Sequence, residues 1–114
     1  MAVEDSDILS DLDAVIRSRW DADPDASYVA GLLADGPGTI ARKMGEEAIE
    51  AVVAGLDEDR EALINEVADL WFHSMVLLAA RGASSHAVRA ELARRFGLSG
   101  LEEKAGREDQ SSSR

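Results

Sequence analysis

Two pairs of acidic residues, each spaced to lie on one face of a helix, are the residues of this chain best suited to chemistry. The first pair is Glu47 and Glu50, and the second is Glu66 and Asp69. Residues three apart in a helix share a face, so each pair sets two carboxylates side by side. Hard divalent cations prefer carboxylate oxygens as ligands. The spacing therefore predicts a Mg²⁺ site, in which Mn²⁺ could substitute, shared by two helices.

The segments that carry these acids are otherwise apolar on most of their circumference. In residues 40–56 an arc of roughly 100° holds Lys43, Glu46, Glu47 and Glu50. In residues 63–80 an arc of roughly 60° holds Glu66, Asp69 and His73. Burying an unpaired charge costs several kcal/mol, so acids in such surroundings need a partner. A metal ion between the two acidic stripes would supply one. The alternative is that the carboxylates line a solvated groove and only keep the protein soluble.

A helical period runs through nearly the whole chain, and no alternating strand pattern appears. We expect five helices. Asp5 or Ser6 caps the first. The second starts near Ser27 and the third near Ile40, while Asp57 caps the fourth and Ser84 or Ser85 caps the fifth. The third is expected to end at Gly55, a residue suited to a left-handed end. A short connection from there to residue 59 makes the two acidic helices antiparallel neighbours.

The composition fits a soluble protein that binds neither nucleic acid nor membranes. The chain has 114 residues, a formal net charge of −11 and no cysteine. Binding to nucleic acid or to anionic membranes relies on Lys and Arg. The longest apolar run, residues 67–80, is interrupted by polar residues and is shorter than the ~20 residues of a membrane span. We therefore expect a cytoplasmic location.

So short a chain has few elements to cover two helices that are apolar on most faces. We therefore expect a homodimer or a higher homo-oligomer, whose core includes Val52, Trp71 and Met75. Residues 5–97 are expected to form one all-α domain, residues 98–107 a C-terminal segment that could close the active site, and residues 108–114 a polar, disordered tail.

Four segments, in this order, carry a resemblance to a known family. They are residues 27–33 (SYVAGLL), 43–50 (KMGEEAIE), 66–73 (EVADLWFH) and 99–105 (SGLEEKA). Together they resemble the phosphoribosyl-ATP pyrophosphohydrolases of histidine biosynthesis, which belong to the all-α, MazG-like nucleotide pyrophosphohydrolases. The resemblance implies a helical bundle of about five helices completed by homo-oligomerisation. It also implies Mg²⁺-dependent hydrolysis of phosphoribosyl-ATP to phosphoribosyl-AMP and pyrophosphate, the second step of that pathway.

The resemblance also assigns roles to residues of this chain. By motif position the metal ligands are Glu47, Glu50, Glu66 and Asp69. Either Glu46 or Glu47 would be the catalytic base, since at least one acid must stay free to take a proton from the attacking water. Lys104 and Arg107 could hold the substrate phosphates from the C-terminal segment. Lys43 could also reach a phosphate, because it lies on the acidic arc one turn before Glu47.

Several readings stay open at this point. Lys43 could instead pair with Glu46 and Glu47 along its own helix, and His73 fits a hydrogen-bonded core histidine better than an acid or base. The family often has lysine at Gly31, and Leu-Tyr where this chain has Trp71-Phe72. The alternative functions are a house-cleaning (deoxy)nucleoside triphosphate pyrophosphohydrolase and a non-enzymatic helical dimerisation module.

Overall fold

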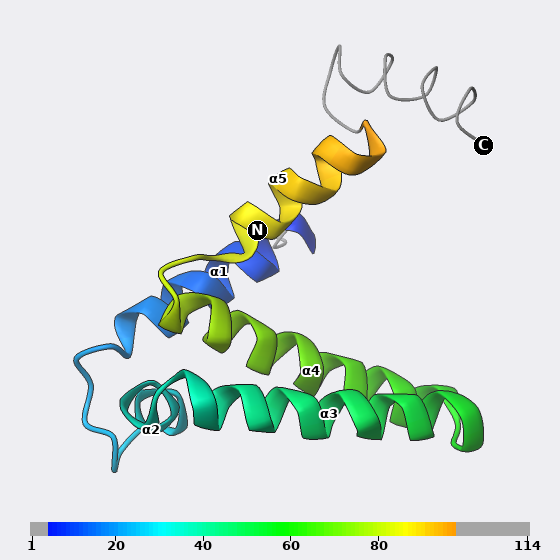
Figure 1. Cartoon of the computed structure of the whole chain (residues 1–114), viewed down its shortest axis with the longest axis horizontal. Coiled ribbons are helices and arrows are strands. Elements are labelled where there is room, and N and C mark those ends of the chain that lie inside the picture. Colours follow the sequence, from blue (N-terminus) through cyan, green and yellow to red (C-terminus); the bar gives the residue numbers. More distant parts are fainter. Residues whose placement is uncertain (1–4, 98–114) are drawn as a thin grey trace. The chain divides into compact units, whose positions relative to one another are not determined.

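The computed structural model describes the backbone of residues 5–97 and the side chains of residues 8–97, and over this range the protein is all-helical (Figure 1). The helices are α1 (Asp5–Ser18), α2 (Tyr28–Asp35), α3 (Pro37–Asp57), α4 (Arg60–Ala80) and α5 (Ser85–Phe96). The expected all-α class with five helices is confirmed. Residues 98–107 and 108–114, for which we expect a closing segment and a tail, lie outside the described residues.

The chain divides into two compact units between Ala83 and Ser84. The first unit contains α1 to α4 and therefore both acidic helices, while the second contains α5.

The junction between α2 and α3 explains why α3 begins earlier than the sequence period suggests. The Ser27 side chain caps α2 by accepting a hydrogen bond from the Ala30 amide at 3.2 Å. A single residue, Gly36, then separates the two helices with a φ of 96°, a conformation that favours glycine. Pro37 follows as the first residue of α3, where its missing N–H costs nothing. The helix therefore starts three residues before Ile40.

The turn between α3 and α4 also differs from expectation. Gly55 stays within α3, and a Cβ built there would lie 3.6 Å from Leu63 Cδ1, so this glycine lies close to α4. The predicted left-handed helix end at Gly55 was therefore wrong. The cap of α4 is Asp59, whose carboxylate accepts from the Ala62 amide at 2.9 Å, and Asp57 is instead the last residue of α3.

The α3–α4 hairpin is the main structural unit around the acids. The two helices have equal lengths of 21 residues and lie side by side, antiparallel, along most of their length (Figure 1). The buried core lies at one end of the hairpin, where α1 and α2 pack against it. Its members are Ile16, Leu32, Leu33, Ile40, Met75 and Val76.

Helix α4 is long and apolar enough to cross a membrane by length and composition, and it is the one helix of the described part of the chain that is. The expectation concerned only the run of residues 67–80, which is shorter than the whole helix. Core helices of soluble proteins also reach this length and composition. Only 17% of its most apolar window is buried within the chain, and many of its other side chains are half-buried.

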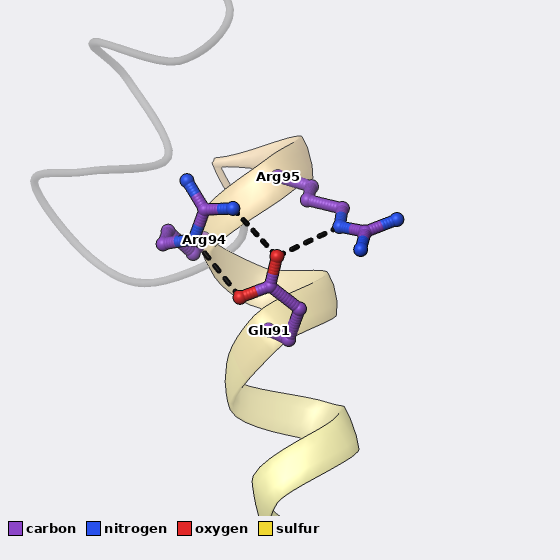
Figure 2. Close-up of polar contacts among 3 residues, drawn as sticks. All are labelled: Glu91, Arg94 and Arg95. Carbon is purple, nitrogen blue, oxygen red and sulfur yellow. Dashed lines mark hydrogen bonds and ion pairs between the residues drawn. The ribbon is translucent and has the colours of Figure 1, made fainter.

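The second unit contains a short, charged helix. Ser84 caps α5 by accepting from the His86 amide at 3.3 Å, and the helix ends at Gly97 with a φ of 62°. Both Arg94 and Arg95 donate hydrogen bonds to the Glu91 carboxylate (Figure 2). Hydrogen bonds from Arg94 and then Arg95 lower the pKa of Glu91 to about 2. These side chains are exposed, so the pairs organise this surface more than they stabilise the fold.

Shortening Ile40 should destabilise the first unit in steps. Ile40 is 0% exposed, so Ile40→Val should lower the free energy of unfolding by roughly 0.5–1.5 kcal/mol and Ile40→Ala by roughly 2–5 kcal/mol. Urea unfolding followed by circular dichroism measures both changes. Equal stability of all three proteins would show that this residue is not part of the core.

Candidate metal centre

The hairpin brings three of the four predicted ligands together. Glu47 on α3 and Glu66 and Asp69 on α4 each offer one carboxylate oxygen, and these oxygens all lie within 4.8 Å of one another. Glu47 and Glu66 are half-buried, whereas Asp69 is exposed. The antiparallel packing of α3 on α4 produces this group, because it sets the middle of one helix against the first half of the other.

The other predicted acids lie close by but outside this group. Glu50 is exposed, and its oxygens are not among those that converge. It is nevertheless near enough for its charge to raise the pKa of Glu66. Glu46 is also exposed and lies next to Glu47 along α3, outside the group of three. The fold therefore separates the acids into a converging set and a flanking set.

Glu66 experiences the strongest electrostatic conflict at this site. Partial burial raises its pKa above the ordinary value of 4.5, and repulsion from nearby carboxylates raises it further. These carboxylates are, in decreasing order of effect, Glu50, Glu47, Asp69 and Glu58. Among the described residues, no cation is among the causes that act on the pKa of Glu66, and Lys43 makes no ion pair there. The ion pair of Lys43 with Glu46 and Glu47 is therefore not formed.

The donor set fits a hard divalent cation. All three donors are carboxylate oxygens, which suit Mg²⁺ and Mn²⁺, and there is no thiolate or imidazole among them. Exposed acidic groups are common without a metal, but here two members are half-buried and the pKa of one is raised by its neighbours. A cation would relieve both the desolvation and the repulsion.

His73 lies one turn beyond Asp69 and is 6% exposed. Its Nδ1 lies 2.9 Å from the backbone carbonyl oxygen of Asp69, and its Nε2 lies 2.9 Å from the Tyr28 hydroxyl. A carbonyl can only accept, so Nδ1 carries a proton and donates it. In the neutral ring Nε2 therefore accepts from Tyr28. This confirms the reading of His73 as a hydrogen-bonded core histidine.

Sequence reasoning missed Tyr28 as a residue near the site. Its ring stacks on Phe72, with ring centroids 6.2 Å apart, and lies edge-on to His73. Tyr28 thus brings a phenol hydroxyl from α2 to His73 on α4. The only signal in the sequence was its place in the SYVAGLL segment, since contact with α4 spans 45 residues.

Of the three residues predicted to bind phosphates, only Lys43 lies among the described residues. Lys43 is exposed on α3 one turn before Glu47 and lines a pocket with residues of α2. Lys104 and Arg107 lie outside the described residues, so their assignment stays a prediction.

Comparison with known proteins connects this geometry to a family. The family "Phosphoribosyl-ATP pyrophosphohydrolase" matches residues 9–96, which include every residue of the acidic group. The chain belongs to this family. Three bacterial relatives named phosphoribosyl-ATP pyrophosphatase are similar to it over most of their length. The relative from Variovorax paradoxus (strain S110) is 55% identical over 95% of this chain and 91% of its own.

The relatives from two other bacteria show the same degree of similarity. The phosphoribosyl-ATP pyrophosphatase of Erythrobacter litoralis (strain HTCC2594) is 56% identical over 89% of this chain and 97% of its own. That of Methylobacterium nodulans (strain LMG 21967 / CNCM I-2342 / ORS 2060) is 50% identical over 87% and 92%, respectively. Membership of the phosphoribosyl-ATP pyrophosphohydrolase family makes this chain a hydrolase, and the resemblance drawn from the four sequence segments is confirmed.

Removing the charge of Glu66 should stabilise the protein when divalent cations are absent. A raised carboxyl pKa means that the ionised form is less favourable in the folded than in the unfolded chain, so at neutral pH Glu66 opposes folding. Glu66→Gln should therefore raise the melting temperature in EDTA at pH 7. The advantage over wild type should shrink as the pH falls toward the raised pKa, where wild-type Glu66 is protonated.

Glu61→Gln is the matched control for this experiment. Glu61 is an exposed acid in the first turn of the same helix, where a negative charge is favourable, and it is not part of the acidic group. Removal of the Glu61 charge should leave the melting temperature unchanged or lower it. A lower melting temperature for Glu66→Gln than for Glu61→Gln would contradict the repulsion described here.

Proposed function

We propose that the chain hydrolyses the α–β phosphoanhydride of phosphoribosyl-ATP to phosphoribosyl-AMP and pyrophosphate, the second step of L-histidine biosynthesis, with Mg²⁺ held between α3 and α4. The observation that supports this most directly is the convergence of Glu47, Glu66 and Asp69 in a member of the phosphoribosyl-ATP pyrophosphohydrolase family. The names of its relatives support the choice of substrate.

The residues of the chain have separate tasks in this reaction. Glu47, Glu66 and Asp69 would hold the cation, and the nearby Glu50 would be a further ligand. When bound, Mg²⁺ would neutralise charge on the phosphate oxygens and on the pyrophosphate leaving group. Lys43 makes no ion pair in the described range, so its ammonium is left to approach a substrate phosphate.

The attacking water must lose its proton to a carboxylate that is not fully engaged elsewhere. Glu46 fits this requirement, because it adjoins Glu47 but lies outside the converging group. Glu47 remains the alternative base, through whichever of its two oxygens is not used as a ligand. Lys104 and Arg107 are proposed to bind phosphates from the C-terminal segment.

A house-cleaning hydrolase of (deoxy)nucleoside triphosphates could use the same acidic group. The printed names of the relatives favour phosphoribosyl-ATP. Comparing pyrophosphate release from phosphoribosyl-ATP, ATP and dCTP under identical conditions separates the two functions. It also excludes the non-enzymatic dimerisation module if any of the three is hydrolysed. Because phosphoribosyl-ATP is a charged, water-soluble nucleotide, we place the reaction in the cytoplasm.

We further propose that the protein acts as a homodimer or a higher homo-oligomer. The described chain leaves large apolar side chains of the hairpin exposed, which water does not favour. They are Ile49, Val52, Val53 and Leu56 on α3, and Ile64 and Trp71 on α4. Met75, which we also expected at the interface, is instead buried in the core of its own chain, so that assignment was wrong. A second copy of the same hairpin would cover the exposed apolar side chains.

Divalent cations should bind to the acidic group and support turnover. Mg²⁺ or Mn²⁺ should raise the melting temperature of the wild type, since a ligand of the folded state stabilises it by mass action. EDTA should abolish pyrophosphate release. Glu47→Gln and Asp69→Asn should lose both the metal-induced rise and most turnover, by at least about 100-fold, while keeping helical circular dichroism.

The control is Glu61→Gln, which should keep the metal-induced rise and the activity of the wild type. Glu66→Gln should have a higher melting temperature than wild type in EDTA. Addition of Mg²⁺ should raise its melting temperature by less than it raises that of wild type. Full activity of Glu47→Gln or Asp69→Asn would refute the assignment of the metal site.

A charge placed on the apolar face of the hairpin should disrupt assembly. Val52 is 57% exposed in the single chain, so Val52→Asp should leave an isolated chain folded. In a dimer the same carboxylate would be buried without a partner, at a cost of several kcal/mol. Light scattering should show the dimer mass for wild type and for Asn65→Asp, which adds the same charge at an exposed polar position. A monomeric, cooperatively unfolding wild type would contradict the proposed dimer.

A further inference from the structure

A pocket with a volume of about 370 Å³ opens between α2, the residues just before it and the first turns of α3. This volume lies in the range of small-molecule sites, roughly 300–1,000 Å³. Lys43 lines the pocket and lies one helical turn before Glu47. The pocket therefore leads away from the acidic group toward the N-terminal end of α3.

The charged side chains that line the pocket favour one orientation of a bound nucleotide. Lys43 is the only positively charged side chain among the lining residues, and it lies on the side of the acidic group. Asp35, at the end of α2, and Asp25, in the preceding loop, also line the pocket. Lys43 attracts a phosphate, whereas Asp25 and Asp35 repel it. The two aspartates can instead accept hydrogen bonds from sugar hydroxyls. A nucleotide would therefore enter with its phosphates toward Lys43.

Tyr28 provides the aromatic surface of this pocket. The residue lines the pocket and is 57% exposed, although two contacts hold its ring in place. Phe72 stacks against one side of the ring, and the hydroxyl donates to Nε2 of the buried His73. An aromatic ring that lines a pocket, is partly exposed and is held by two contacts is suited to stacking with a planar base.

We propose that Tyr28 is a substrate-positioning residue on which the base of a purine nucleotide stacks, while Lys43 directs the phosphates of that nucleotide toward the acidic group. This inference rests on the proposed function and specifies how the same site holds its substrate.

His73 fixes the position of this platform relative to the metal ligands. Its Nδ1 donates to the backbone carbonyl of Asp69, and its Nε2 accepts from Tyr28. The platform on α2 is thus connected through one side chain to the turn of α4 that carries Asp69. His73 acts through Tyr28 and does not touch the substrate.

The test measures binding of AMP and of ribose 5-phosphate to the full-length chain by calorimetry in Mg²⁺. Tyr28→Ala should weaken AMP binding by about tenfold, as expected for a lost base stack, and leave ribose 5-phosphate binding unchanged. Tyr28→Leu, which keeps the bulk of the side chain, should have the same effect and covers the case in which the alanine variant fails to fold. Lys43→Gln should weaken binding of both probes. The control is Trp20→Ala, an exposed aromatic residue that does not line the pocket.

The role of His73 has its own readout. Tyr28→Phe keeps the ring but loses its hydrogen bond, and AMP binding should weaken by about threefold. His73→Gln, whose side-chain oxygen can still accept from Tyr28, should retain wild-type affinity, whereas His73→Ala should resemble Tyr28→Phe. With phosphoribosyl-ATP the Tyr28→Ala change should appear as a higher KM with little change in kcat.

Two results would overturn the inference. One is AMP affinity in Tyr28→Ala and Tyr28→Leu equal to that of wild type. The other is equal weakening of AMP and ribose 5-phosphate in these variants, since a stack acts on the base alone. Failure of the proposed function gives a different result, in which wild type binds AMP in a Tyr28-dependent way but does not hydrolyse phosphoribosyl-ATP.

Discussion

Repulsion between carboxylates that the fold forces together is the interaction on which the rest of this molecule depends. Packing α3 antiparallel to α4 brings oxygens of Glu47, Glu66 and Asp69 within 4.8 Å of one another. Partial burial and the neighbouring charges raise the pKa of Glu66, so this carboxylate opposes folding when it is ionised. The packing that opposes this cost is the apolar contact along the two helices. A bound cation would turn the same geometry from a cost into a gain.

This arrangement explains why the stable core lies away from the acids. The buried residues of α3 and α4 in the core cluster, Ile40, Met75 and Val76, gather where α1 and α2 cover one end of the hairpin. That end fixes the two long helices relative to each other, and the acidic group lies further along them. The exposed apolar residues of the same hairpin, such as Leu56 at 78% exposure, are surface that a second copy can cover. Assembly and metal binding would then stabilise the same pair of helices.

The short helix α2 links the core to the acidic group. Its residues Leu32 and Leu33 are buried in the core, while Tyr28 at its start reaches α4 through His73. Gly36 permits α3 to follow at once, so Lys43 and the lining residues of α2 share one pocket. One helix of eight residues thus both closes the core and shapes the approach to the acids.

The sequence alone determined the elements and the chemistry of this protein. Helical periodicity gave the all-α class, and the i, i+3 spacing of the acids gave the carboxylate faces, because both depend on local backbone geometry. Four ordered segments were enough to indicate the family. Helix ends were less predictable: Asp57 and Asp59 are equally good caps by residue type, and α3 continues through Gly55 to Asp57.

Tertiary structure decided which of the acids converge and what surrounds them. Spacing could not separate Glu50 from Glu47, since both lie on one face of α3, and the difference arises from how α4 crosses it. The spacing of residues also could not predict the contact of Tyr28 with His73, nor the burial of Met75 in the core of its own chain. Both depend on residues far apart in the sequence. Such contacts depend on the angles and offsets between helices, which are set by the packing of the whole core and not by any local pattern.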